Sequence, residues 1–141
     1  MAIKFYEADK KVKLPRKIEL KRYLVDLFRR EATPLQSLTF IFCSDEYLLA
    51  INREFLNHDY YTDIITFSLG PTGEPIVGEI YISLDRVKEN AQSAKQLFLV
   101  ELHRVIFHGA LHLCGFDDKT RVHRKAMTRM ENAYLHSYRF M

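Results

Sequence analysis

The sequence predicts a single α+β domain in which helices cover a small mixed sheet of about four strands. Three observations predict this fold. Strand patterns are concentrated in the first 83 residues, helical patterns dominate the remainder, and no repeat or interdomain linker interrupts the chain. With 141 residues, of which 48% are hydrophobic, the chain can bury one core and has no room for a second domain. Residues 1–141 are therefore expected to form one domain.

The first third of the chain predicts a strand, a helix and a second strand. Residues 2–6 alternate between apolar and polar side chains, as in a strand. A basic connector ends at Pro15, and apolar residues then recur at helical spacing to about Glu31. Pro34 follows this helix, after which residues 38–43 form a continuous β-branched and aromatic run. Such a run predicts a buried strand.

A second helix is expected to begin after Ser44 or Asp45, because either side chain can cap a helix N-terminus. Its pattern ends near Asn57, and a loop of polar and aromatic residues continues to Tyr61. The apolar side chains at helical spacing in this helix are Tyr47, Leu48, Ile51 and Phe55.

The middle of the chain predicts a hairpin, and the rest predicts helices. Residues 64–67 and 76–83 have strand patterns, and the intervening Gly70 and Pro71 indicate a turn, so the two strands are expected to pair. The predicted helices after them cover residues 84–94, 97–114 and 120–138.

Charge is distributed unevenly along the chain. The formal net charge is only +3, but nine Lys or Arg residues lie between Lys10 and Arg30 against only Glu19 and Asp26. A basic segment of this kind is most often a solvated helix face. It also offers a surface to an anionic partner.

The two cysteines, Cys43 and Cys114, form no CxxC pair, which argues against a disulfide framework and against a thiolate zinc site. Reduced, buried thiols are expected. The N-terminal residues do not form an apolar signal segment, and no later run approaches membrane-spanning length. A cytoplasmic protein is expected.

The segment from His108 to Asp118, HGALHLCGFDD, ends the most apolar predicted helix and contains residue types that bind metals. His108 and His112 are four residues apart, so they lie about 6 Å from each other along one helix face, where two imidazoles can bind one cation. Gly115 suits a left-handed helix end, which lets the chain reverse and bring back a third ligand. Asp117 and Asp118 are the candidates for that ligand.

With Asp118 as third ligand, the pattern is His-x-x-x-His-x-x-Gly-x-x-Asp, which is the ligand spacing of the metzincin zinc site. A metalloprotease needs Glu directly after the first His as its general base, and this chain has Gly109 there. A peptidase would therefore lack its catalyst.

Three further residues near the histidine pair have less certain roles. Cys114 lies about 200° around the helix from His112 and is expected in the core. His103 is about 140° from His108 and is expected at the helix surface or between helices. Glu101 returns to the face of His108, where it orients a ligand, lines the cleft or is simply exposed.

These residues resemble the YbeY family of bacterial metal-dependent endoribonucleases, whose signature is His-Gly-x-Leu-His-Leu-x-Gly-Tyr-Asp-His. Residues 108–118 match nearly every position of that signature. The similarity covers most of the chain after residue 45 and includes Asn52, residues 62–67, residues 78–83, and Met127 with Glu131.

The resemblance implies a single-strand-directed ribonuclease that acts in 16S rRNA maturation and ribosome quality control. It also implies one Zn²⁺ per chain, held by His108, His112 and Asp118. The implied partners are single-stranded or ribosomal RNA and the ribosome, with no membrane and no DNA.

Two positions depart from the family pattern. The third ligand is usually His, and Asp118 in its place lowers the charge of the site, so that zinc stays the expected metal while another divalent transition metal is compatible. An Arg of the Asn52 segment is replaced by Leu56, which removes a phosphate-binding guanidinium. The candidates to replace it are Arg53, His58 and Arg104, and His58 is favoured because its loop borders the metal site in the family's arrangement.

No general base stands out from the sequence. Asp63 and Asp117 are candidates, although Asp63 can equally cap a strand end and Asp117 a turn. Tyr60 and Tyr61 either stack on unpaired bases or pack the loop. Basic residues that can hold the RNA backbone are those between Lys10 and Arg30 together with Arg121, Arg124, Lys125 and Arg129.

The alternative interpretation is a non-catalytic ribosome- or RNA-binding protein in which the metal is structural. The loss of the family Arg at Leu56 favours it. A structural zinc normally has four protein ligands, however, and only three are evident here, which favours an open catalytic position.

Overall fold

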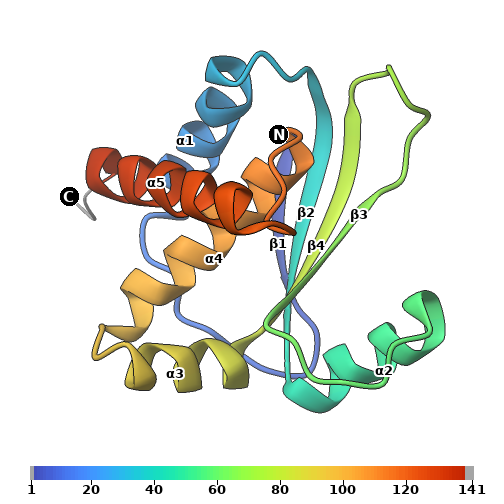
Figure 1. The fold of residues 1–141 in the computed structure, drawn as a ribbon, viewed down its shortest axis with the longest axis vertical. Helices are drawn as coiled ribbons and strands as arrows, with labels where there is room; N and C mark the ends of the chain where they lie inside the picture. Colours follow the sequence, from blue (N-terminus) through green and yellow to red (C-terminus); the bar gives the residue numbers. More distant parts are fainter. Residues whose placement is uncertain (1, 139–141) are drawn as a thin grey trace.

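The nine helices and strands expected from the sequence all occur within residues 2–138, the part of the chain that the computed structural model describes (Figure 1). The elements in chain order are β1 (Ile3–Glu7), α1 (Lys17–Arg30), β2 (Leu35–Cys43), α2 (Asp45–Leu56), β3 (Ile64–Ser68), β4 (Ile76–Ser83), α3 (Leu84–Ser93), α4 (Phe98–Leu113) and α5 (Arg121–Tyr138).

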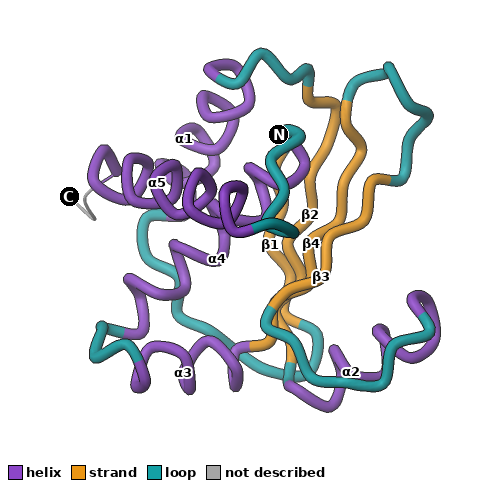
Figure 2. Tube along the Cα trace, in the orientation of Figure 1, coloured by secondary structure: helices purple, strands orange, loops and turns teal. Residues whose placement is uncertain are grey.

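The four strands form one mixed sheet in the order β1-β2-β4-β3 (Figure 2). β1 and β4 each pair with β2 in parallel, whereas β3 pairs with β4 antiparallel, which confirms the predicted hairpin. β2 begins at Leu35, earlier than the predicted residue 38, because its pairing with β4 extends to Leu35 opposite Ile76. The α+β class with a small mixed sheet is confirmed.

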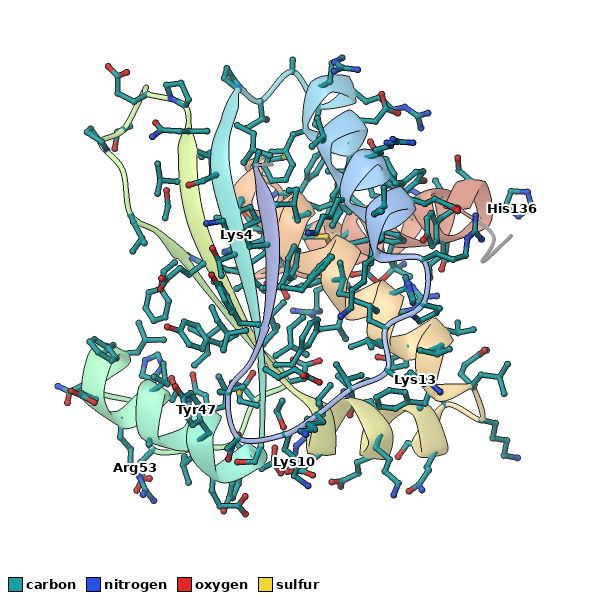
Figure 3. All side chains as sticks on the ribbon, turned by 180° about the vertical axis from the view of Figure 1, so that it is seen from behind. Lys4, Lys10, Lys13, Tyr47, Arg53 and His136 are labelled. Atoms are coloured by element: carbon teal, nitrogen blue, oxygen red, sulfur yellow. The ribbon has the colours of Figure 1, made fainter. Side chains whose placement is uncertain are left out.

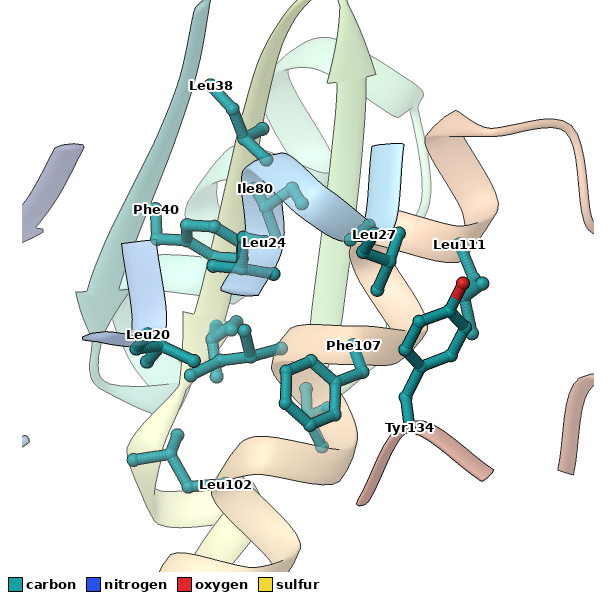
Figure 4. Close-up of a cluster of buried hydrophobic side chains, with 14 of the residues drawn as sticks. Leu20, Leu24, Leu27, Leu38, Phe40, Ile80, Leu102, Phe107, Leu111 and Tyr134 are labelled. Carbon is teal, nitrogen blue, oxygen red and sulfur yellow. The ribbon is translucent and has the colours of Figure 1, made fainter. Parts of the chain in front are cut away.

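The helices lie on both sides of the sheet. α1, α3, α4 and α5 cover one face, and α2 packs against the other (Figure 1). α4 lies centrally in the larger layer, with Leu102, Phe107 and Leu111 fully buried against side chains from α1 and the sheet (Figure 4). A continuous apolar face of this kind explains the high hydrophobicity of the α4 sequence.

Local signals at two helix ends occur as the sequence predicts. Ser44 accepts a hydrogen bond from the backbone N–H of Tyr47 at 3.1 Å, so it is the N-cap of α2. At the end of α4, Gly115 has a φ of 103°, and its N–H donates to the His112 carbonyl, while Phe116 N–H donates to the Leu111 carbonyl. This Schellman arrangement turns the chain back toward α4.

Both cysteines are free thiols, Cys43 buried and Cys114 partly buried. Burial is the main cause that raises the pKa of Cys43 to about 12 and that of Cys114 to about 11. Both thiols are therefore protonated and poorly nucleophilic at neutral pH. Among the described helices, none is both long and apolar enough to cross a membrane.

Candidate metal centre

A cavity of about 380 Å³ lies where β3 and the loop before it face α4 and α5. All three predicted metal ligands line it, and so does Asp63, one of the predicted catalytic residues. The complete lining is Thr62, Asp63, Ile64, Thr66, Glu101, Arg104, Val105, His108, His112, Asp118 and Glu131.

Close packing of α4 on the sheet fixes the position of the histidine pair. A Cβ at Gly109 would lie 2.8 Å from Ile64 Cδ1 and 3.0 Å from Ile80 Cδ1, closer than real side chains approach. The residue after His108 therefore faces the contact between α4 and the sheet. Gly109 itself carries no side chain that could act as a base, which agrees with the argument against a peptidase.

His108 is oriented by a carboxylate from another helix. Its Nδ1 lies 2.6 Å from Glu131 Oε2. Because an ionised carboxylate only accepts hydrogen bonds, Nδ1 carries the proton, so in the neutral ring the lone pair is on Nε2, which lies 3.5 Å from Asp118 Oδ2. A carboxylate–histidine pair of this kind fixes the ring and tautomer of metal-binding histidines.

The environment of His108 also controls its charge. Burial by itself would lower the pKa of His108, but the hydrogen bond and the negative charge of Glu131, with smaller contributions from Asp118 and Asp63, raise it overall. The cavity thus stabilises positive charge at this position.

Glu131 is held in turn by Arg104, whose Nη1 lies 3.0 Å from Glu131 Oε1. Arg104 also donates to Asn132 Oδ1 at 2.8 Å and lies 4.0 Å from Glu101. A chain of contacts thus runs from Arg104 through Glu131 to His108. Sequence reasoning noted Glu131 only as part of the family resemblance. The sequence feature that could have identified Glu131 is its position on the otherwise apolar face of α5, where a buried charge needs a partner.

Asp63 lies just before β3, where its backbone carbonyl accepts from Ser83 N–H and its Oδ2 lies 3.3 Å from the Asn90 side-chain nitrogen. Burial raises the pKa of the Asp63 carboxyl, and the nearby His108 opposes this shift in part. A carboxylate with a raised pKa in a cavity is suited to accept a proton.

The cavity has an excess of negative charge. Its walls carry one guanidinium, from Arg104, against four carboxyl groups, from Asp63, Glu101, Asp118 and Glu131. Two imidazoles and a carboxylate at the rim are ordinary ligands for Zn²⁺ or a similar cation. The donor chemistry therefore fits a divalent metal ion.

The predicted ligands share the cavity without being assembled into a coordination shell. Within residues 2–138, no three His, Cys, Asp or Glu side chains are already gathered closely enough to hold a metal. His112 and Asp118 are exposed residues of the cavity lining, so both are accessible from solvent.

Two predicted catalytic residues do not line the cavity. His58 is exposed, with its Nδ1 2.9 Å from Tyr60 Oη and its ring stacked on that tyrosine. Asp117 Oδ1 lies 2.8 Å from His123 Nδ1 and accepts a hydrogen bond from the Lys119 N–H, so this side chain stabilises the turn before α5.

Of the three residues considered as replacements for the missing Arg, only Arg104 is among the described residues that line the cavity. Arg53 forms an ion pair with Asp59 on the exposed side of α2 (Figure 3), and Leu56 is exposed at the end of that helix. The buried Asn52 donates to the Tyr60 carbonyl at 2.9 Å and thereby anchors the loop after α2.

The two remaining residues of α4 have clear positions. Glu101 is nearly buried and lines the cavity, as one of its predicted roles required. His103 lies between helices, and the surface alternative is wrong, since its side chain is fully buried and its ring stacks on Tyr138 at 5.4 Å. Burial lowers the pKa of His103, against a smaller opposing effect of the Leu99 carbonyl.

Comparison with known proteins gives the same family as the signature residues. The family described as Endoribonuclease YbeY matches residues 3–139. Proteins named Endoribonuclease YbeY from Cytophaga hutchinsonii and Parabacteroides distasonis are 45% and 41% identical to this chain over 136 and 135 residues, which is 96% of this chain and 95% or 94% of theirs.

A solution structure from Thermotoga maritima has the same fold, with a TM-score of 0.66 and 27% sequence identity over 97% of this chain and 91% of that one. The family match to residues 3–139 includes the four strands, α4 with its histidine pair and α5 with Glu131. From its sequence, its fold and its relatives, this chain belongs to the YbeY endoribonuclease family.

Proposed function

We propose that this protein is a metal-dependent endoribonuclease that cleaves single-stranded RNA, with 16S rRNA maturation and ribosome quality control as its roles and the ribosome as its partner in the cytoplasm. The names of its relatives support RNA cleavage. The expectation of a ribosomal substrate comes from the family resemblance.

The acidic character of the cavity is the observation that carries this proposal. A phosphodiester is anionic, and four carboxyl groups against one guanidinium repel it unless a cation binds first. Zn²⁺ is the proposed cation, because His108, His112 and Asp118 offer two nitrogens and one oxygen and leave a fourth position open. When bound, such a metal polarises a phosphate oxygen and acidifies a coordinated water.

The chain's own residues have distinct proposed tasks. Glu131 holds His108 with Nε2 facing the cavity, and Arg104 holds Glu131. Asp63 accepts the proton of the attacking water, since burial raises its pKa toward the range in which a general base works. Arg104 places a positive charge on the cavity wall, which is the proposed replacement for the guanidinium that Leu56 lacks.

The experiment compares ligand variants with neighbours of the same chemistry. His112→Ala and Asp118→Ala are expected to lose bound metal and to lower cleavage of a single-stranded RNA at least about 100-fold. Metal content is measured by elemental analysis of purified protein, and cleavage by gel analysis of an end-labelled RNA.

His123→Ala and Asp117→Ala are the matched controls, because they remove the same groups from the turn beside the cavity. They are expected to keep both metal and activity. Bound metal without metal-dependent cleavage in the parent protein would reject the enzyme and favour the binding protein with a structural metal.

A further inference from the structure

The exposed side of α5 carries four cations around a shallow groove of about 340 Å³. The groove is lined by Arg121, Arg124, Lys125, Thr128 and Arg129, which we call the α5 groove. Among residues 2–138, no carboxylate forms an ion pair with any of its four cations, and the Arg124 guanidinium donates to the Lys119 carbonyl. Arg121, Lys125 and Arg129 follow one another at four-residue spacing, where like charges repel and destabilise a helix.

The basic segment between Lys10 and Arg30 differs in this respect. Lys10 pairs with Asp85 at 3.0 Å, and Arg16 pairs with Glu19. Arg29 and Arg30 both pair with Asp26. Four of its nine cations are thus paired with carboxylates of the chain, whereas none of the four cations of the α5 groove is paired within residues 2–138.

The two basic regions also lie differently with respect to the cavity. The connector that carries Lys10 and Lys13 is in front in Figure 3, whereas α5 is in front in Figure 1, which views the opposite side. α1 contacts the far end of α5, where Tyr23 Oη donates to the Tyr134 carbonyl. The α5 groove is at the other end, next to the turn that carries Asp118.

The α5 groove and the cavity have no lining residue in common, but residues of α5 line both. Arg104 lines the cavity and donates to Asn132, which is one turn from Thr128 in the groove. Arg124 precedes the cavity residue Glu131 by seven residues, so it lies about 10 Å along the axis on nearly the same face. A strand that leaves the cavity in this direction meets the four cations.

We propose that the α5 groove binds the phosphates of the RNA segment that flanks the bond at the cavity. This inference rests on the proposed function. Because the cavity walls are acidic, contacts to phosphates beside the cleaved bond must come from outside the cavity, and the α5 groove supplies them. The groove contains no aromatic side chain, so it recognises the backbone and not the base sequence.

The test removes three of the four charges. The variant Arg121→Gln/Lys125→Gln/Arg129→Gln is titrated against a fluorescein-labelled single-stranded RNA of about a dozen nucleotides, as zinc-loaded full-length protein at several KCl concentrations. We expect about tenfold weaker binding at low salt and a plot of log affinity against log salt that is flatter by about 2. Its thermal midpoint is expected to stay equal to the parent's or rise, because repulsion is relieved.

The matched control is Lys13→Gln/Lys17→Gln/Arg22→Gln, which removes three exposed charges near or on α1. It is expected to change affinity less than twofold. Equal losses in the two variants, or an unchanged salt slope in the α5 variant, would overturn the proposal.

Hydrolysis of bis(p-nitrophenyl) phosphate, which is too small to reach the α5 groove, distinguishes this proposal from the proposed function. The α5 variant is expected to hydrolyse it at the parent rate. If the parent binds RNA with the expected slope but cleaves neither substrate, the proposed function fails and the α5 groove stands. A loss of small-substrate hydrolysis in the folded α5 variant would contradict a role confined to RNA binding.

Discussion

The two faces of α4 share one backbone but carry different chemistry. One face buries Leu102, Phe107 and Leu111 against the sheet and α1, while the other directs Arg104 and His108 into an acidic cavity. Packing on the first face positions the groups of the second. The stability of this protein and its proposed chemistry thus depend on different sides of the same helix.

His103 and His108 show the difference in one residue type. Burial lowers the pKa of His103, which lies among aromatic rings. At His108 the same burial is outweighed by Glu131 and its neighbours, which raise the pKa. On one helix, the core thus favours the neutral form of His103, whereas the carboxylates around His108 favour its charged form.

The largest expected effect is on the core face. Phe107→Ala leaves a cavity among Tyr23, Tyr138 and the sheet, so the free energy of unfolding should fall by about 3–5 kcal/mol. Urea denaturation measures it. Phe55→Ala, at a ring that is 61% exposed, should cost far less. Similar losses for both would show that α4 is not the centre of the core.

The next largest effect is expected for the hydrogen bond between Glu131 and His108. Glu131→Gln keeps the shape but weakens the orienting hydrogen bond, so Zn²⁺ affinity should fall about 10- to 100-fold. Competition with a chromophoric chelator measures the dissociation constant. Glu74→Gln in an exposed turn is the control and should leave it unchanged. An unaltered affinity in the Glu131 variant would separate Glu131 from the metal site.

A smaller effect is expected at Gly109, where α4 packs closely against the sheet. Gly109→Ala forces a methyl against Ile64 and Ile80, which should cost about 1–3 kcal/mol of unfolding free energy. Gly70→Ala, where the nearest atoms are 3.8 Å away, should be nearly neutral. Equal stability of the two variants in thermal denaturation would contradict the close approach of α4 to the sheet.

The smallest expected effect is the pH dependence from His103. Its pKa is lower in the folded protein than in the unfolded chain, so its contribution to stability is present above about pH 6.5 and is lost as the pH falls below it. The free energy of unfolding of His103→Phe should therefore fall less than that of the parent between pH 7 and pH 5. Parallel urea titrations at the two pH values measure the difference. Identical losses of unfolding free energy in the two proteins would show that protonation of His103 does not destabilise the fold.

Regular elements and local signals could be predicted from the sequence because they depend on short-range physics. Helical spacing predicted α4, Ser44 and Gly115 predicted two helix ends, and turn residues predicted the β3–β4 hairpin. The histidine pair followed from helix geometry. All of these depend on residues that are close in the chain.

The rest of the cavity depends on contacts between distant segments. Glu131 meets His108 only because α5 packs across α4, and nothing in the order of residues shows that crossing. For the same reason His58 was favoured over Arg104, although His58 contacts Tyr60 in its own loop. The pairing of Asp26 with Arg29 and Arg30, by contrast, joins residues three and four apart on one helix.

The central claim is that the cavity binds one divalent metal on which RNA cleavage depends. Metal-stripped protein is titrated with Zn²⁺ while bound metal and cleavage of a single-stranded RNA are followed in the same samples. We predict that both rise together and reach a plateau at one equivalent per chain, and that neither does so in His112→Ala. Full cleavage by the metal-stripped protein, or a plateau of bound metal without cleavage, would contradict the claim.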